Sequence, residues 1–173
     1  MSGLAPLTLG AALLLTSCNN PPPAPSASAP SAAAADSDAR PFNTKLEVKQ
    51  FMAHAIDPIS DAIWEKQGWV IDAAGEHELF PTTDADWTAQ SNASIALSEL
   101  GNALLLPGRG ASDEKRWQEY AAALNKMALR QSEAAVKKDK QAFFDAGGQV
   151  YEVCKDCHQK YILGEDNAPP PPQ

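Results

Sequence analysis

The sequence predicts an all-α protein that folds as an antiparallel four-helix bundle. Four stretches between Thr44 and Tyr161 carry apolar residues at spacings of three and four, the period of an amphipathic helix. No stretch alternates apolar and polar residues as a half-buried strand does. Pro81 separates the first stretch from the second, and the pair Pro107-Gly108 separates the second from the third. The connections between the second, third and fourth stretches are short, so consecutive helices would run in opposite directions around one core.

The first helix is expected over residues 44–64. Pro58 falls inside it and should kink it, because the proline ring leaves the carbonyl of His54 without a donor. Residues 65–82, with Gly68, Gly75 and Pro81, are expected to be a connection. The apolar stripe of this helix is predicted from residues at helical spacing: Val48, Met52, Ala55, Ile59 and Ile63.

The two middle helices are delimited by helix-capping and helix-stopping residues. Thr83 is a good N-cap for the second, which ends before Pro107. The third is expected to start at Ser112 and to close at Lys138. The predicted core face of the second helix is Ala93, Leu97, Leu100 and Leu104, and that of the third is Trp117, Ala121, Leu124, Ala128 and Ala135.

The fourth helix has the most regular pattern. Asp139 is its predicted N-cap, and the steps along its apolar seam alternate between four and three. The seam therefore directs two cysteines toward the core. Its members are Phe143, Gly147, Val150, Cys154, Cys157 and Tyr161.

Five consecutive residues of this helix, Cys154-Lys155-Asp156-Cys157-His158, match the C-x-x-C-H signature of covalent haem c attachment. Thiols three residues apart lie on one side of a helical turn, where both can form thioethers to one haem. His158 is one turn after Cys154 and is expected to be the proximal ligand of the haem iron. Alternatively, the two thiols form a disulfide or a redox pair, although thioredoxin-like chemistry would require a βαβ setting.

A four-helix bundle with C-x-x-C-H near the end of its last helix resembles the cytochrome c prime family (class II c-type cytochromes). The resemblance rests on Gly147-Gly148 before the motif, on the motif itself and on Tyr161 after it. It is loose over residues 43–163 and better over 143–161. The resemblance implies one haem c, electron transfer or binding of diatomic gases, and frequent homodimers.

Met52 is the candidate for the sixth ligand of the haem iron. In the cytochrome c prime family the first helix lines the distal face, either with a ligating Met or with an apolar residue that leaves the site open. All methionines of this chain lie upstream of the motif, and nothing after His158 can ligate. Alternatively, Met52 simply fills a gap in the core. His54 is expected to face solvent or the edge of a neighbouring helix. His77 is expected to be a solvated loop residue, with the alternative that the long connection folds it over the haem.

The beginning of the chain reads as an export signal. Residues 1–17 resemble a lipoprotein signal peptide, and Leu15-Thr16-Ser17-Cys18 fits a cleavage box that makes Cys18 the lipidated first residue. Alternatively, cleavage near Ala27-Ser28-Ala29 releases a soluble periplasmic protein. Residues 18–41 are rich in Pro and Ala and are expected to form a tether. A cytochrome domain at 42–166 and a Pro-rich tail at 167–173 complete the predicted organisation.

The charge and the motifs of the chain narrow the classes of partner and activity that fit it. The net charge of −8 disfavours nucleic acid and anionic membrane surfaces as partners. No phosphate-binding loop, zinc-protease motif or nucleophile elbow is present, so the protein is not expected to be an enzyme. The leading hypothesis is a periplasmic, membrane-tethered one-electron carrier that serves redox partner proteins. The alternatives are a haem protein that binds nitric oxide or carbon monoxide, and a structural lipoprotein whose two cysteines pair.

Overall fold

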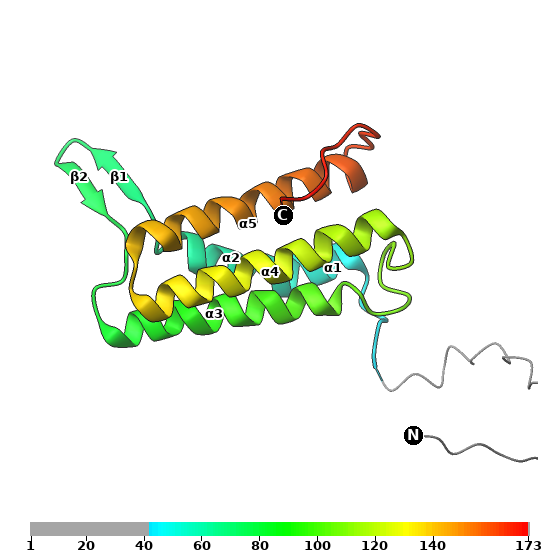
Figure 1. The fold of residues 1–173 in the computed structure, drawn as a ribbon, viewed down its shortest axis with the longest axis horizontal. Coiled ribbons are helices and arrows are strands. Elements are labelled where there is room, and N and C mark those ends of the chain that lie inside the picture. Colours follow the sequence, from blue (N-terminus) through cyan, green and yellow to red (C-terminus); the bar gives the residue numbers. More distant parts are fainter. Residues whose placement is uncertain (1–41, 173) are drawn as a thin grey trace, which may run out of the picture. The chain divides into compact units, whose positions relative to one another are not determined.

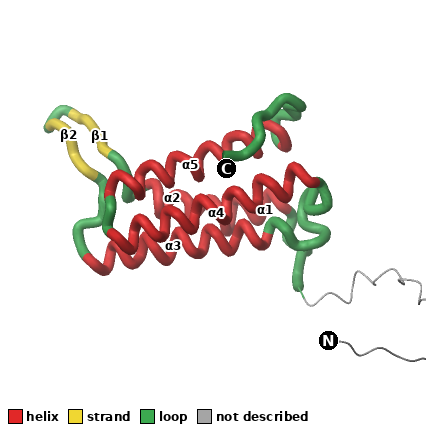
Figure 2. The backbone as a smooth tube through the Cα atoms, in the orientation of Figure 1, coloured by secondary structure: helices red, strands yellow, loops and turns green. Residues whose placement is uncertain are grey.

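The computed structural model describes residues 42–172, so the predicted signal peptide, Cys18 and the tether lie outside the described residues. The described part is mostly helical, as predicted, with one β-hairpin in addition (Figures 1 and 2). No helix within 42–172 combines the length and apolar character needed to cross a membrane.

The first predicted helix is divided into three segments. α1 (Val48–Phe51) leads into a π-helical turn, η2 (Met52–Ile56), and α2 (Asp57–Trp64) follows. Pro58 has no N–H to offer the carbonyl of His54, and its ring crowds that carbonyl. The N–H of Asp57 bonds to the carbonyl of Met52, five residues back. The disturbance expected at Pro58 therefore takes the form of a π-helical turn, a feature that is frequent at functional sites.

The π-helical turn moves the buried face of this helix. The buried side chains are Phe51, Ile56, Ser60 and Ile63, and the step of five residues from Phe51 to Ile56 spans the turn. The predicted stripe assumed a constant period and needs correction. Its first four members pack half-buried at the edge of the core: Val48, Met52, Ala55 and Ile59.

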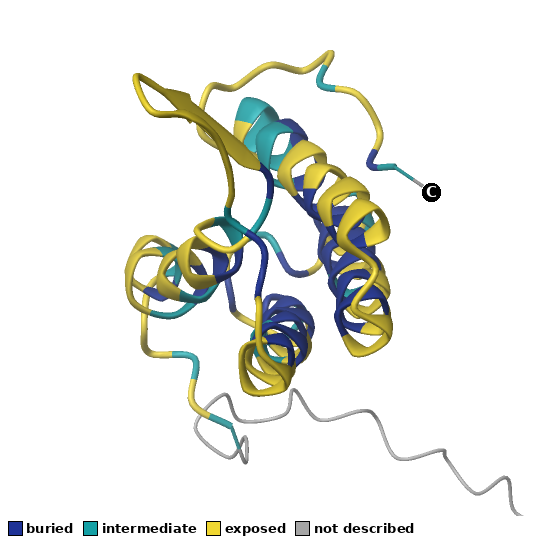
Figure 3. Cartoon of the chain, turned by 90° about the vertical axis from the view of Figure 1, so that its left-hand side faces the viewer, coloured by how far each residue is buried: buried dark blue, intermediate teal, exposed yellow. Residues whose placement is uncertain are grey.

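A β-hairpin occupies the connection in which no strand was predicted, and that prediction is wrong. β1 (Trp69–Asp72) pairs antiparallel with β2 (Gly75–Glu78). The Asp72 carboxylate accepts a 2.7 Å hydrogen bond from the N–H of Ala74, and Gly75 takes a φ of +122° that few other residues adopt. All eight strand residues are exposed, so no alternation of apolar and polar residues marks the hairpin (Figure 3).

The three remaining helices are α3 (Asp84–Ala103), α4 (Lys115–Lys137) and α5 (Lys140–Tyr161). They run in alternating directions, and α4 packs against both neighbours (Figure 1). The predicted caps are confirmed, because Thr83 and Asp139 accept hydrogen bonds from backbone N–H groups in the first turns of α3 and α5. α4 starts later than predicted, at Lys115. Ser112 lies in the preceding loop, where its hydroxyl accepts a hydrogen bond from the N–H of Gly108 and its carbonyl accepts one from the side chain of Gln118 in α4.

The buried face of α3 is more polar than predicted. Of its four predicted aliphatic residues, only Leu97 and Leu104 are buried. The rest of the face is mostly small or polar: Gln90, Ser91, Ser94, Ser98 and Gly101. Hydroxyl groups pair across the helices, as in the 2.9 Å bond between Ser91 and Ser132. A Cβ at Gly101 would lie 3.3 Å from the α4 backbone, so small residues permit the close approach of α3 and α4.

The Pro-rich segment after α5 packs against the helices. The hydroxyl of Tyr120 on α4 donates a 2.5 Å hydrogen bond to the carbonyl of Pro169, and Pro171 is buried. The predicted boundary at residue 166 therefore does not separate a free tail from the helical unit, at least through residue 172.

Candidate cofactor cavity

A cavity of about 480 Å³ is lined by side chains from η2 and α2, from the first turns of α4 and from α5. We call it the main cavity. Its lining is largely apolar and aromatic: Met52, Ile56, Trp64, Leu104, Trp117, Tyr120, Ala121, Leu124, Tyr151, Val153 and Leu163. Ligand pockets in proteins commonly measure roughly 300–1,000 Å³ and have this apolar character.

The C-x-x-C-H residues face this cavity. Cys154, Cys157 and His158 all line it from the last two turns of α5. Both cysteines are free and half-buried, whereas His158 is exposed on its other side. The seam predicted for the fourth helix accounts for this placement, since Phe143, Gly147 and Val150 bury the same face earlier in α5.

Met52 lines the same cavity from η2. Farther along, the rings of Trp64 on α2 and Tyr151 on α5 meet edge to face with centroids 6.3 Å apart. Because α2 and α5 run in opposite directions (Figure 1), Met52 and His158 lie on the same side of that contact. The structure thus places Met52 in the same cavity as Cys154, Cys157 and His158, which lie far from it in the sequence.

The environment keeps the two thiols protonated. Burial, with a smaller contribution from the Asp57 carboxylate, raises the pKa of Cys154 to about 11. Burial likewise raises the pKa of Cys157 to about 12, with Cys154 adding to the shift. Reactive redox cysteines require the opposite shift, because the thiolate is the active form. The site therefore suits neutral sulfur.

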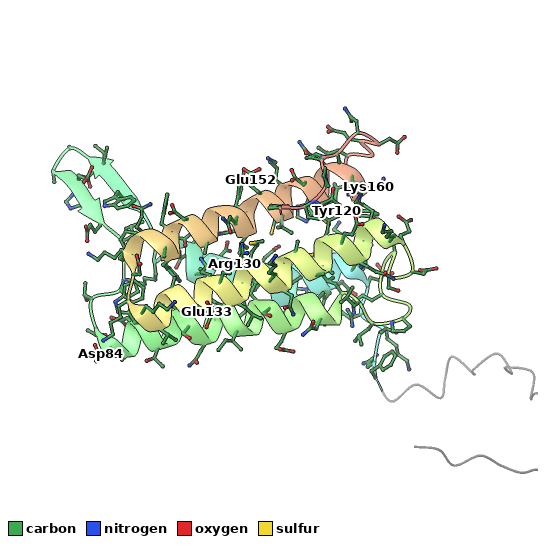
Figure 4. All side chains as sticks on the ribbon, in the orientation of Figure 1. Asp84, Tyr120, Arg130, Glu133, Glu152 and Lys160 are labelled. Atoms are coloured by element: carbon green, nitrogen blue, oxygen red, sulfur yellow. The ribbon has the colours of Figure 1, made fainter. Side chains whose placement is uncertain are left out.

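Aromatic side chains form the wall beside the motif. Trp117 donates a 2.8 Å hydrogen bond to the carbonyl of Leu104, and its ring lies 5.0 Å from that of Tyr161. Tyr120 is 6.4 Å from Tyr161 and lies beside the end of α5 (Figure 4). Burial raises the pKa of both tyrosines, so both stay neutral phenols at neutral pH. The polar atoms of this wall are all hydrogen-bonded, since the Tyr120 hydroxyl donates to the Pro169 carbonyl and the Tyr161 hydroxyl donates to the Glu114 carboxylate.

Three polar residues of α2 that line the cavity were not singled out from the sequence. Ser60 is buried on α2, and its hydroxyl has no hydrogen-bond partner among the described residues. Asp57 and Asp61 line the cavity from the same helix and are exposed. The shift of face at the π-helical turn explains the omission, because a constant helical period places none of them on the apolar stripe.

The other predicted candidates lie elsewhere. His54 is exposed on η2, and His77 is exposed on the hairpin, where its Nε2 lies 3.1 Å from the Asp72 carboxylate. Within residues 42–172, no three His, Cys, Asp or Glu side chains are grouped to hold a metal ion. Comparison of the chain with protein-family models, with curated proteins and with solved structures found no match.

Proposed function

We propose that this protein is a c-type cytochrome: an antiparallel four-helix bundle that holds one covalent haem through Cys154 and Cys157 and transfers single electrons. The observation that carries the proposal is that both cysteines, His158 and Met52 line one largely apolar cavity. The C-x-x-C-H spacing and the resemblance to the cytochrome c prime family support the same assignment. The proposal includes export, with Cys18 as a lipid anchor at the periplasmic face of a membrane.

The residues of the cavity fit the group. Thioether formation adds each S–H across a vinyl C=C bond, so both sulfurs end uncharged and no oxidant or reductant is consumed. An uncharged sulfur matches a site in which burial disfavours both thiolates. A redox-active thiol pair would leave a thiolate in the same apolar surroundings, at a cost in free energy.

The side chains have separate tasks in this proposal. Cys154 and Cys157 tether the group, the His158 imidazole offers a nitrogen ligand, and the Met52 thioether offers a sulfur ligand from η2. When bound, the haem iron supplies the reversible change between ferric and ferrous states. Apolar residues such as Ile56 and Leu124 keep water from the site, and burial together with the axial ligands tunes the reduction potential.

One observation favours a second candidate, the binding of carbon monoxide or nitric oxide. Ile56 lines the cavity one turn after Met52 on the same helix. If Ile56 instead of Met52 covers the sixth position, no side chain ligates there, and the site is open to diatomic gases.

An optical spectrum of the exported, purified protein tests both candidates. We expect the bands of a low-spin haem c in the oxidised protein and slow carbon monoxide binding after reduction. A high-spin spectrum with fast carbon monoxide binding would favour the gas-binding protein. A spectrum without haem bands would reject both candidates.

A further inference from the structure

The main cavity is lined by two negatively charged side chains that form no ion pair within residues 42–172. Asp57 and Asp61 lie one turn apart on α2, line the cavity and are exposed. Among residues 42–172, neither carboxylate has a hydrogen bond or ion pair through its side chain. Their field is therefore directed to solvent at the mouth of the cavity rather than neutralised by the fold.

The cations nearby are already engaged. Lys155, which also lines the cavity, pairs with Glu152 and lies 3.4 Å from the carboxylate of Asp156. The ammonium group of Lys160 lies 5.7 Å from the centre of the Tyr161 ring. Lys160 keeps its charge but does not line the cavity. Of the Asp, Glu, Lys and Arg side chains that line the cavity among the described residues, only the two aspartates are without an ion pair.

Two exposed apolar side chains line the same cavity as these carboxylates. Tyr151 is 55% exposed and Leu163 is 67% exposed, and both line the cavity. Ile162, the neighbour of Leu163, is 68% exposed. Single exposed apolar residues are ordinary, but two that line one cavity, with a third next to them in the chain, resemble the apolar centre of a protein interface, around which polar groups form a rim.

We infer that the mouth of the main cavity is the docking surface for a redox protein whose contact face presents Lys or Arg around an apolar centre. The inference rests on the proposed function and names the partner class that fits it. Opposite charges speed the encounter of such proteins, and electron-transfer contacts are small and short-lived. Asp57 and Asp61 would repel phosphates and anionic lipids, which disfavours a nucleic acid or an anionic membrane surface at this site.

The test compares two small oxidants of opposite charge on the reduced, haem-loaded protein. The probes are tris(phenanthroline)cobalt(III), a cation, and ferricyanide, an anion. In the variant Asp57→Asn/Asp61→Asn, we expect the oxidation rate with the cation to fall by about three- to tenfold at low salt and the rate with the anion to rise. Both differences should shrink at high salt. The control Glu76→Gln/Glu133→Gln removes two exposed carboxylates that do not line the cavity, and should leave both rates unchanged.

A second readout does not depend on electron transfer. Titration with hexaamminecobalt(III) should shift the backbone amide resonances of Asp57 and Asp61 in the wild type and not in the variant. A haem-loaded protein whose rates and resonances are indifferent to the substitutions would overturn the docking inference alone. A purified protein without haem would overturn the proposed function and the inference with it.

Discussion

The indole ring of Trp64 on α2 meets the phenol ring of Tyr151 on α5 edge to face, with the ring centroids 6.3 Å apart. Both rings line the main cavity, and their contact bridges the two helices at that level. The cavity extends from there toward Met52 and His158. Aromatic pairs of this geometry contribute about 0.5–1.5 kcal/mol beyond area burial, enough to favour one helix spacing.

The ligand role of Met52 is tested by a pair of isosteric substitutions. Met52→Leu keeps the volume of the side chain and removes its sulfur, so the oxidised protein should change from low-spin to high-spin and bind carbon monoxide much faster when reduced. Met127→Leu is the matched control, because Met127 is fully buried on α4 and does not line the cavity. Identical spectra for wild type and Met52→Leu would refute the assignment.

The glycine pair of α5 should respond in opposite ways to alanine. A Cβ at Gly147 would overlap the side-chain amide of Gln67 and lie 2.7 Å from that of Gln131, whose mutual hydrogen bond is 2.9 Å long. The lost hydrogen bond of the buried Gln131 amide should cost more than the helix propensity that alanine gains, so Gly147→Ala should lower the free energy of unfolding by a net ~1–2 kcal/mol. At Gly148 nothing lies within 4 Å of a Cβ. Gly148→Ala should raise stability by roughly 0.5–1 kcal/mol, as measured by urea denaturation.

The raised pKa values of the thiols predict a dependence of stability on alkaline pH in the haem-free protein. The unfolded chain ionises these cysteines near pH 9, whereas the fold holds their pKa at about 11 and 12. Their stabilising contribution is thus complete below pH 9 and is lost as the pH rises through those values, by on the order of 1 kcal/mol per thiol at pH 10.

Urea denaturation at pH 8 and pH 10 measures this effect. Other groups titrate in the same range, so the comparison is with Cys154→Ala/Cys157→Ala, which should lose less stability between the two pH values. Haem-loaded protein, whose sulfurs cannot ionise, should behave like the variant. If the haem-free wild type and the variant lost the same free energy of unfolding between pH 8 and pH 10, the result would contradict the burial of the thiols.

The docking of the C-terminal segment depends on one hydroxyl group. Tyr120→Phe removes the donor to the Pro169 carbonyl and should cost about 0.5–1.5 kcal/mol. Hydrogen exchange at the amide of Ala168, which bonds to the Glu165 carbonyl, should become faster as the segment loosens. Tyr151→Phe is the control, because the Tyr151 hydroxyl makes no hydrogen bond among the described residues. Unchanged exchange in Tyr120→Phe would show that the proline contacts suffice.

The parts of the fold that follow local rules were predictable from the sequence. The caps at Thr83 and Asp139 need only a side-chain oxygen two or three residues before a free N–H. The seam of α5 was predictable because its helix is uninterrupted, so a constant period places Cys154 and Cys157 together on the cavity side.

The rest depends on interactions that periodicity does not encode. The π-helical turn lengthens the step between the buried residues Phe51 and Ile56 to five, and this shift of the buried face hid the role of Ser60. The hairpin is anchored by Trp69, whose ring lies 5.1 Å from Phe80 and 5.4 Å from Phe144 on α5. Such contacts between distant segments decide the structure of a connection that has no buried face of its own.

The measurement that tests the central claim most directly is whether haem stays with the polypeptide after acid–acetone extraction. The protein is produced in a host that matures c-type cytochromes, extracted and weighed by intact mass spectrometry. We predict the mass of the chain plus one haem for the wild type, weakened attachment in Cys154→Ser and Cys157→Ser, and no covalent haem in the double variant. A wild-type chain that carries no haem after maturation and extraction would contradict the account.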